Sequence, residues 1–223
     1  MSDLFYPDKK RRSVYSKTIK GTYYTSYNHY RQEIREDSLF RCVYCDIHEA
    51  ENGGDEHMNL DHFRPKGLDR FSLLVNDPNN LVWSCAGCNN LKRHHWPVSD
   101  EELPFVGKEG FIDPFADSYR VYFSISDEGL LTPLKDPAQY MIMILALNRE
   151  SRKRVRELRI IKNNLINAFS LKIDDLIIWE KEIMLDVSLN DEQKASEAQK
   201  VDEMRSWLVM HLEMIKKLIA NYS

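Results

Sequence analysis

The four cysteines of the chain form two pairs with the same spacing, Cys42 with Cys45 and Cys85 with Cys88. Two residues between thiols let one tight turn direct both sulfurs at a single ion, and two such pairs complete the tetrahedron of thiolates that zinc prefers. A four-thiolate site has no open coordination position, so the sequence predicts a structural zinc rather than a catalytic one. Redox pairs or free core thiols are the alternative, and two pairs that bracket one compact segment argue against both.

An adjacent carboxylate and imidazole, Asp61 and His62, lie between the two cysteine pairs. A neutral imidazole has an unperturbed pKa of about 6.5, which suits it to accept a proton near neutral pH. A carboxylate is a hard oxygen ligand for a divalent cation. Successive side chains of a strand point to opposite faces, so both residues can serve one site only where the strand ends, and Pro65 supplies that ending. Taken alone, the pair is more typical of an ordinary surface pair. Asn80 and Asn89 in the same segment favour a chemical role.

The spacing of these residues resembles that of the HNH endonucleases, also called ββα-metal nucleases. The resemblance rests on Cys42-x-x-Cys45, Asp61-His62-x-x-Pro65, Asn80-Leu81 and Cys85-x-x-Cys88-Asn89-x-x-Lys92, and it covers residues 41–95. The longer strings D-H-F-R-P-K from Asp61 and N-L-V-W-S-C from Asn80 resemble a narrower group. That group is the PtuB-like HNH proteins of bacterial Septu and retron anti-phage systems, which act with an ABC-type ATPase.

The resemblance implies a role for each matching residue. Asp61 corresponds to the first ligand of a catalytic Mg²⁺ or Mn²⁺, and His62 to the general base that activates water. Asn80 corresponds to the residue that braces the loop and orients the histidine. Asn89 stands where many members carry a histidine ligand, and its carboxamide oxygen is a hard, neutral ligand that suits Mg²⁺ better than a softer metal. Family precedent implies in-line attack that leaves 5′-phosphate and 3′-hydroxyl ends.

Basic side chains gather in three places. Beside the expected site they are Arg64, Lys66, Lys92 and Arg93, which we expect to contact phosphates, with ordinary surface charge as the alternative. Residues 149–162 hold Arg149, Arg152, Lys153, Arg154, Arg156, Arg159 and Lys162. This second run is typical of a surface laced with ion pairs, and a nucleic-acid channel or a surface for an acidic partner is the alternative. The run at residues 9–12 favours a solvated, partly disordered arm, with a phosphate contact as the alternative.

Composition and charge narrow the class of protein. The chain has 223 residues, of which 43% are hydrophobic and 30% charged, as in ordinary globular proteins. A net charge of −4 gives no global attraction to nucleic acid, so phosphate binding must come from local clusters. No apolar run approaches the roughly 20 residues that span a bilayer, and the first ten residues lack the apolar core of a signal peptide. We therefore expect a cytoplasmic protein without a membrane partner, whose paired cysteines suit a reducing compartment.

Short strands and a helix must position the expected site. Alternation of polar and apolar residues predicts a strand over 57–62, and a second short strand is predicted over 81–83. A short helix is predicted from Asn89 to a point before Pro97. Turn residues between two apolar segments predict a small hairpin within residues 119–134.

The remainder of the chain is predicted to be helical. Asp136 and Pro137 are typical of a helix start. Two long amphipathic helices separated near residues 186–190 should pack as an antiparallel pair, and Asn190 with Gln193 resembles a capping box. We therefore expect an α+β chain in three parts. They are an N-terminal arm and helix (1–40), a zinc-clamped ββα-metal HNH domain that ends in the small hairpin (41–135), and a helical region for binding a partner or nucleic acid (136–223).

The leading functional hypothesis is a metal-dependent HNH endonuclease that hydrolyses phosphodiester bonds. DNA is favoured over RNA, and the expected setting is the nuclease effector of an anti-phage complex with an ABC-type ATPase. The alternatives are an RNA-cleaving HNH effector and a catalytically idle, zinc-built module that binds a partner. One such site cuts one strand, so a double-strand break requires a homodimer, a second pass or another protein. No base-specific contact can be inferred from the sequence.

Overall fold

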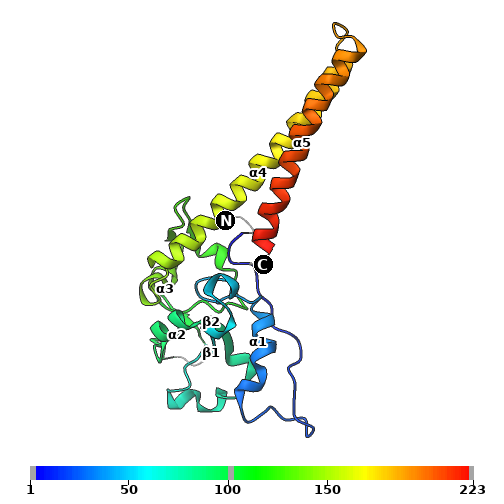
Figure 1. The fold of residues 1–223 in the computed structure, drawn as a ribbon. Coiled ribbons are helices and arrows are strands. Elements are labelled where there is room, and N and C mark those ends of the chain that lie inside the picture. Colours follow the sequence, from blue (N-terminus) through cyan, green and yellow to red (C-terminus); the bar gives the residue numbers. More distant parts are fainter. Residues whose placement is uncertain (1–3, 100–102, 221–223) are drawn as a thin grey trace. The chain divides into compact units, whose positions relative to one another are not determined.

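The computed structural model describes residues 4–99 and 103–220, and it has the α+β class expected from the sequence (Figure 1). Three two-stranded antiparallel sheets precede a long helical region. The chain divides into two compact units, the first ending at Glu157 and the second beginning at Leu158. None of the helices within the described residues is long and apolar enough to cross a membrane.

A short hairpin and helix form the centre of the first unit. Strand β1 (Met58–His62) pairs antiparallel with β2 (Leu81–Cys85), and helix α2 (Ala86–Lys92) follows directly. All five residues of β2 are buried, as the apolar run L-V-W predicts for a strand covered on both faces. Helix α2 begins three positions before the expected start at Asn89, because the Cys85 sulfur accepts a hydrogen bond from the backbone N–H of Cys88 and caps the helix.

The basic N-terminal segment is fixed to the first unit, which corrects the expected solvated arm. Arg12 Nε donates to Asp37 Oδ1 at 2.9 Å, and Asp37 closes helix α1 (Arg31–Asp37). Arg11 Nη1 donates to the carbonyl oxygens of Pro78 and Leu81, each at 3.1 Å. Lys9 is buried. A run of like charges indicates solvation only where no acids or carbonyl groups lie within reach, and here distant segments supply both.

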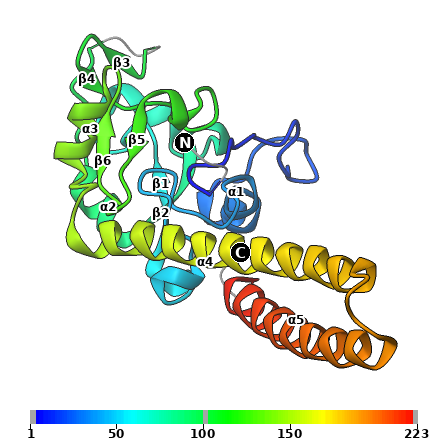
Figure 2. The same cartoon turned by 90° about the horizontal axis from the view of Figure 1, so that it is seen from above.

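Two further hairpins complete the first unit. Strands β5 (Phe123–Ile125) and β6 (Leu131–Pro133) pair within the expected hairpin, and helix α3 (Ala138–Ile144) lies beside β6 (Figure 2). Strands β3 (Phe105–Val106) and β4 (Glu109–Gly110) were not expected, because two residues are too few to show alternation. Gly110 has φ +127°, and a Cβ there would lie 2.5 Å from the Phe105 backbone, so this turn requires glycine.

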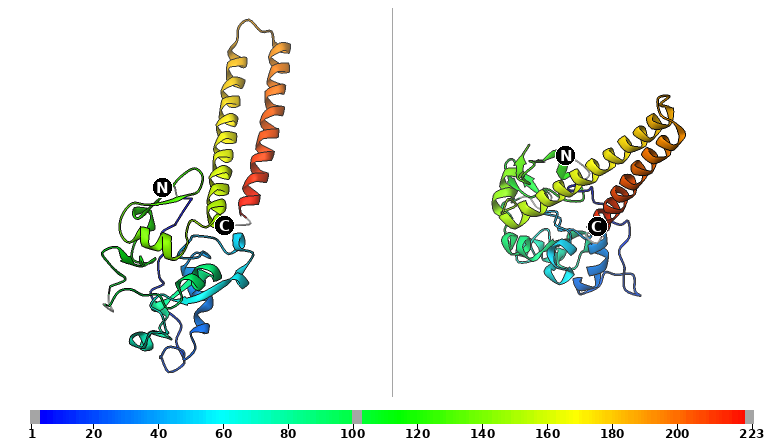
Figure 3. Two further views of the ribbon diagram at one scale, coloured as in Figure 1. Left: turned by 90° about the vertical axis from the view of Figure 1, so that its left-hand side faces the viewer. Right: turned by 45° about the horizontal axis from the view of Figure 1, so that its top comes forward.

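Helix α4 (Glu150–Leu185) begins in the first unit, and the rest of it forms the second unit with α5 (Asp191–Ala220). The two helices lie side by side as the expected antiparallel pair (Figure 3). The capping box is confirmed: Asn190 N–H donates to Gln193 Oε1 at 3.0 Å, and Gln193 N–H donates to Asn190 Oδ1 at 2.9 Å. Leu176, Ile183 and Val201 form the buried core of this hairpin, flanked by Leu189 and Leu208.

Candidate active site and metal centre

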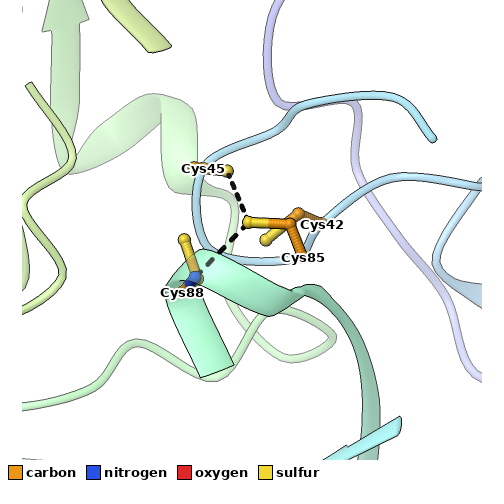
Figure 4. Close-up of side chains that lie close together, drawn as sticks. All are labelled: Cys42, Cys45, Cys85 and Cys88. Atoms are coloured by element: carbon orange, nitrogen blue, oxygen red, sulfur yellow. Dashed lines mark hydrogen bonds between the residues drawn. The ribbon is translucent and has the colours of Figure 1, made fainter. Parts of the chain in front are cut away.

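The four cysteine sulfurs converge from the Cys42–Cys45 loop and the start of α2 (Figure 4). All four side chains are buried, and their sulfurs lie within 4.8 Å of one another. The sulfurs of Cys45 and Cys85 are 3.7 Å apart. A tetrahedral zinc with bonds of about 2.3 Å places its sulfurs about 3.8 Å apart, so the cluster fits a structural metal such as zinc.

Backbone hydrogen bonds fix the first cysteine pair against the second. The N–H of Cys42 donates to the Ile47 carbonyl, and the N–H of Val43 donates to the Trp83 carbonyl of β2, both at 2.9 Å. Asp46 takes the left-handed conformation (φ +62°) directly after Cys45, and its N–H returns to the Cys42 carbonyl. The local turn that the spacing predicts is therefore anchored to the strand that leads into the other pair.

Two arginines contact the cysteine cluster, Arg149 directly before α4 and Arg152 in its first turn. Arg149 Nη2 lies 3.4 Å from the Cys88 sulfur and 3.6 Å from that of Cys85. Arg152 Nη2 lies 3.4 Å from the Cys85 sulfur and donates to Asn52 Oδ1 at 2.9 Å. Burial opposes the charge of Arg149, but the neighbouring sulfurs outweigh it and raise the pKa of this guanidinium group. If the four cysteines bound Zn²⁺ as thiolates, the site would carry a net charge of −2, which these two guanidinium groups would balance.

The rest of the basic run also departs from a simple channel. Arg156 is buried and donates to the carbonyls of Gly129 at 2.7 Å and Leu147 at 3.0 Å. Arg154 is exposed and pairs with Glu150 across one helical turn at 3.6 Å. Three arginines of the run, Arg149, Arg152 and Arg156, therefore contact groups inside the first unit. Counting charges along the sequence does not reveal this role.

A polar cavity of about 460 Å³ opens beside the end of β1. Five of the predicted site residues line it: Asp61, His62, Lys66, Asn89 and Arg93. Tyr27, Arg31 and His94 are among the other lining residues. Among the described residues, Asn80, Arg64 and Lys92 do not line this cavity. Strand β1 and helix α2 thus bring the carboxylate, imidazole and carboxamide into one space.

His62 is held in one orientation by the backbone. Its Nε2 lies 2.9 Å from the Val75 carbonyl oxygen, and a carbonyl only accepts, so Nε2 carries the hydrogen. Nδ1 is then the unprotonated nitrogen, which can accept a proton. Burial lowers the pKa of His62 below its usual value, against the effect of the Val75 carbonyl, and this favours the neutral ring. The Tyr27 ring packs edge-to-face with the imidazole, with 4.7 Å between the ring centroids.

Two donors hold the Asp61 carboxylate. The Tyr44 hydroxyl donates to Oδ2 at 2.7 Å, and Lys92 Nζ lies 3.3 Å from the same oxygen. Tyr44 stands inside the first cysteine pair, and Lys92 ends α2, which begins in the second. Burial and the nearby Asp61 charge raise the pKa of Tyr44, so its hydroxyl remains a donor. The carboxylate is thereby held by one residue from each of the two segments that carry the cysteine pairs.

Asn80 braces the loop after β1. Its Oδ1 accepts from the Arg64 N–H and its Nδ2 donates to the Arg64 carbonyl, both at 2.9 Å. Nδ2 also reaches the Leu74 carbonyl at 3.4 Å, one residue before the carbonyl of Val75 that bonds His62. Asn80 therefore connects the two segments that flank the imidazole without contacting the imidazole itself.

The expected phosphate contact at Lys92 is corrected by its burial. The side chain is fully buried, and Nζ donates to the His62 carbonyl at 2.8 Å as well as pairing with Asp61. Burial lowers the pKa of Lys92, and the Asp61 carboxylate opposes that effect. Arg64 lies over the Trp96 ring, 5.8 Å from its centroid, rather than in the cavity lining. Lys66 and Arg93 remain as the cavity-lining cations of the expected set.

Comparisons of the chain with protein-family models, with curated proteins and with solved structures found no match. The functional assignment therefore depends on the cavity, the residues that line it and the cysteine cluster beside it.

Proposed function

We propose that this chain is a metal-dependent HNH endonuclease that hydrolyses phosphodiester bonds, with DNA as the favoured substrate. One observation carries the proposal: Asp61, His62 and Asn89 line a single cavity together with the cations Lys66 and Arg93. An oriented imidazole, oxygen ligands for a cation and phosphate-binding side chains are what phosphodiester hydrolysis requires.

The oxygen donors of the cavity suit a hard divalent cation. Asp61 offers a carboxylate and Asn89 a carboxamide, and Mg²⁺ or Mn²⁺ binds such ligands. When bound, the cation would stabilise negative charge on the phosphoryl and leaving oxygens. Tyr44 and Lys92 both contact Oδ2 of Asp61, so they orient the carboxylate before any cation arrives.

His62 acts as the general base in this proposal. Its Nδ1 accepts a proton from the attacking water, while the Nε2–H bond to the Val75 carbonyl keeps the ring in place. The lowered pKa keeps the base unprotonated at neutral pH. Lys66 and Arg93 hold the phosphates on either side of the scissile bond and offset their charge.

The cysteine cluster is proposed to hold a structural Zn²⁺. Its four buried sulfurs leave no position for substrate, so it contributes by fixing the fold. It joins the loop that carries Tyr44 to the helix that carries Asn89 and Lys92. The active-site geometry therefore depends on an ion that takes no part in the reaction.

A bacterial anti-phage complex with an ABC-type ATPase is the proposed cellular setting, in the cytoplasm. The two strings D-H-F-R-P-K and N-L-V-W-S-C support this setting by their resemblance to PtuB-like proteins. RNA has the same phosphodiester linkage, so RNA cleavage is an outcome that the substrate test must distinguish.

Plasmid nicking with Mg²⁺, run beside a structured RNA substrate, tests the proposal. His62→Ala should lower the cleavage rate by at least about 10²-fold, because general-base catalysis contributes roughly that much. Its zinc content and thermal transition should stay unchanged. His57→Ala is the matched control, since His57 is exposed and lies just before β1. Wild-type cutting by His62→Ala, or no cleavage of either substrate by the wild-type chain, would refute the proposal.

A further inference from the structure

The second unit carries an apolar groove between its two helices. The groove has a volume of about 480 Å³ and is lined by Leu176, Met204, Trp207 and Leu208. Lys172 of α4 and Glu203 of α5 complete the lining. Trp207 is 53% exposed, although a tryptophan side chain has a large apolar area to bury. About half of this side chain at the groove is therefore not covered by other residues of the hairpin.

The apolar face continues along both helices beyond the groove. On α4, Leu165 and Trp179 stand seven residues before and after Lys172, which places them on the same side of the helix. On α5, Met204, Trp207 and Met214 follow the three-to-four residue spacing of one helical stripe. Leu165, Trp179 and Met214 are all exposed. The face is therefore a seam of the kind that packs against other helices.

The hairpin is also strongly polarised in charge along its length. Its turn end, residues 174–206, contains ten Asp or Glu and four Lys or Arg. Its open end, residues 158–173 with 207–217, contains five Lys or Arg and one Asp or Glu. Two hairpins aligned in the same direction would place like charges together, whereas two antiparallel hairpins place each acidic end against a basic end.

We propose that this face binds a second copy of the same chain, antiparallel, to form a four-helix bundle about a two-fold axis. A two-fold interface requires one patch that complements itself. The groove meets this requirement, because Lys172 of one copy can face Glu203 of the other around two apolar strips. This dimer is independent of the proposed nuclease function, since none of its residues lines the polar cavity.

The face is large enough for a stable dimer. Helix α5 has 30 residues, so at about 1.5 Å per residue and about 10 Å per helix the paired face measures roughly 900 Å². Specific protein–protein interfaces bury about 800 Å² on each partner. In the part of the hairpin whose side chains the structure describes, four apolar side chains are buried: Leu176, Ile183, Val201 and Leu212. This core is small for a pair of helices this long, so burial against a second copy would stabilise the hairpin.

Sedimentation velocity of the full chain tests the seam by comparing variants at two neighbouring positions of α4, Trp179 and Ile178. Trp179 lies on the groove side of α4, whereas Ile178 is 56% exposed on the side away from the core. The wild-type chain should be a dimer, Trp179→Gln should dissociate it with a Kd raised at least about tenfold, and Ile178→Gln should leave it unchanged. Circular dichroism checks that both variants keep their helix content. A wild-type monomer at about 100 µM, or equal effects of the two variants, would overturn the proposal.

Charge reversal tests the antiparallel direction. Four substitutions change the net charge of the turn end from −6 to +2: Asp174→Lys, Asp175→Lys, Glu182→Lys and Glu197→Lys. Three substitutions change the net charge of the open end from +4 to −2: Lys162→Glu, Lys216→Glu and Lys217→Glu. Each reversed variant should be monomeric alone, because both of its ends then carry the same sign. An equal mixture of the two should recover a dimer, because each turn end then meets an open end of opposite charge. Unchanged dimerisation of either reversed variant, or no dimer in the mixture, would exclude this arrangement.

Discussion

At the scale of single residues, the buried pair of Asp61 and Lys92 determines how the candidate site is built. The Lys92 ammonium group lies 3.3 Å from Asp61 Oδ2 and has no exposed surface. Removing one partner of a buried ion pair leaves the other charge without compensation, which costs more than the pair itself contributes. The lysine therefore supplies the opposite charge that a buried carboxylate beside the cavity needs.

Lys92→Met should lower the free energy of unfolding by about 3–5 kcal/mol, since it leaves the Asp61 charge buried and unpaired. Thermal or denaturant unfolding of the full chain measures this loss. Lys66→Met is the matched control, because Lys66 is exposed and its loss should change stability by less than about 0.5 kcal/mol. Equal stability of the two variants would show that the buried pair is unimportant for the fold.

Tyr44→Phe should affect the proposed Mg²⁺ site and leave the proposed zinc site unchanged. The change removes the hydroxyl that donates to Asp61 at 2.7 Å but keeps the buried ring and both flanking cysteines. Zinc content should stay at one ion per chain, as expected for a Cys₄ site. The Mg²⁺ concentration needed for half-maximal cleavage should rise about tenfold, because a hydrogen bond to a charged group contributes about 1.5–3 kcal/mol. An unchanged Mg²⁺ requirement would contradict the role given to Tyr44.

At the scale of elements, local patterns predicted more than long-range contacts did. Alternation and apolar runs place β1 and β2 to within a few residues, and the Asn190–Gln193 capping box follows from its spacing alone. The contacts of Tyr44 with Asp61 and of Lys92 with the His62 carbonyl span 17 and 30 positions. The spacing of residues along the chain does not predict such long-range pairs. Lys92 was therefore expected to contact phosphate at the surface, whereas the structure shows it buried.

The start of α4 gives the clearest case of a helix whose charges serve another element. Arg149 and Arg152, three residues apart, present adjacent guanidinium groups to the cysteine cluster. A sequence of mixed arginines and lysines does not reveal which of them face inward. The cluster supplies that information, because four thiolates around the proposed Zn²⁺ would carry a net charge of −2, and a buried charge needs opposite charges around it.

Arg149→Gln and Arg152→Gln should each weaken zinc binding by about 10–100-fold, the equivalent of one charge-assisted hydrogen bond of about 1.5–3 kcal/mol. Competition with a chromogenic chelator measures the affinity directly, without any assay of cleavage. Arg154→Gln is the control, because Arg154 is exposed and pairs with Glu150 on its own helix. Zinc retention equal to the control in both inward-facing variants would argue against charge compensation.

At the scale of the whole molecule, the two units differ in what stabilises them. In the first unit the buried cysteine cluster joins a loop, a strand and a helix. The second unit depends on a capped helical hairpin with a small core. Because metal binding to such clusters supplies about 10–16 kcal/mol in small zinc modules, the first unit should depend on zinc and the second should not.

Cys85→Ser, or removal of zinc with a chelator, should unfold the first unit and leave the hairpin helical. Tryptophan reports on each unit, since Trp83 and Trp96 lie in the first and Trp179 and Trp207 in the second. The near-ultraviolet circular dichroism of the buried Trp83 and Trp96 should be lost, while the far-ultraviolet signal keeps the helical contribution of α5. A metal-free chain with its complete thermal transition would show that the cysteines do not hold a structural ion.

Because Tyr44 stands between Cys42 and Cys45, the proposed catalysis would depend on the zinc supply of the cell. A cell starved of zinc would synthesise this chain normally and have ample magnesium. Even so, the loop that presents the tyrosine hydroxyl would not close, and the carboxylate would lose one of its two anchors. On the proposed mechanism, scarcity of one trace element would silence the enzyme without any change in its expression.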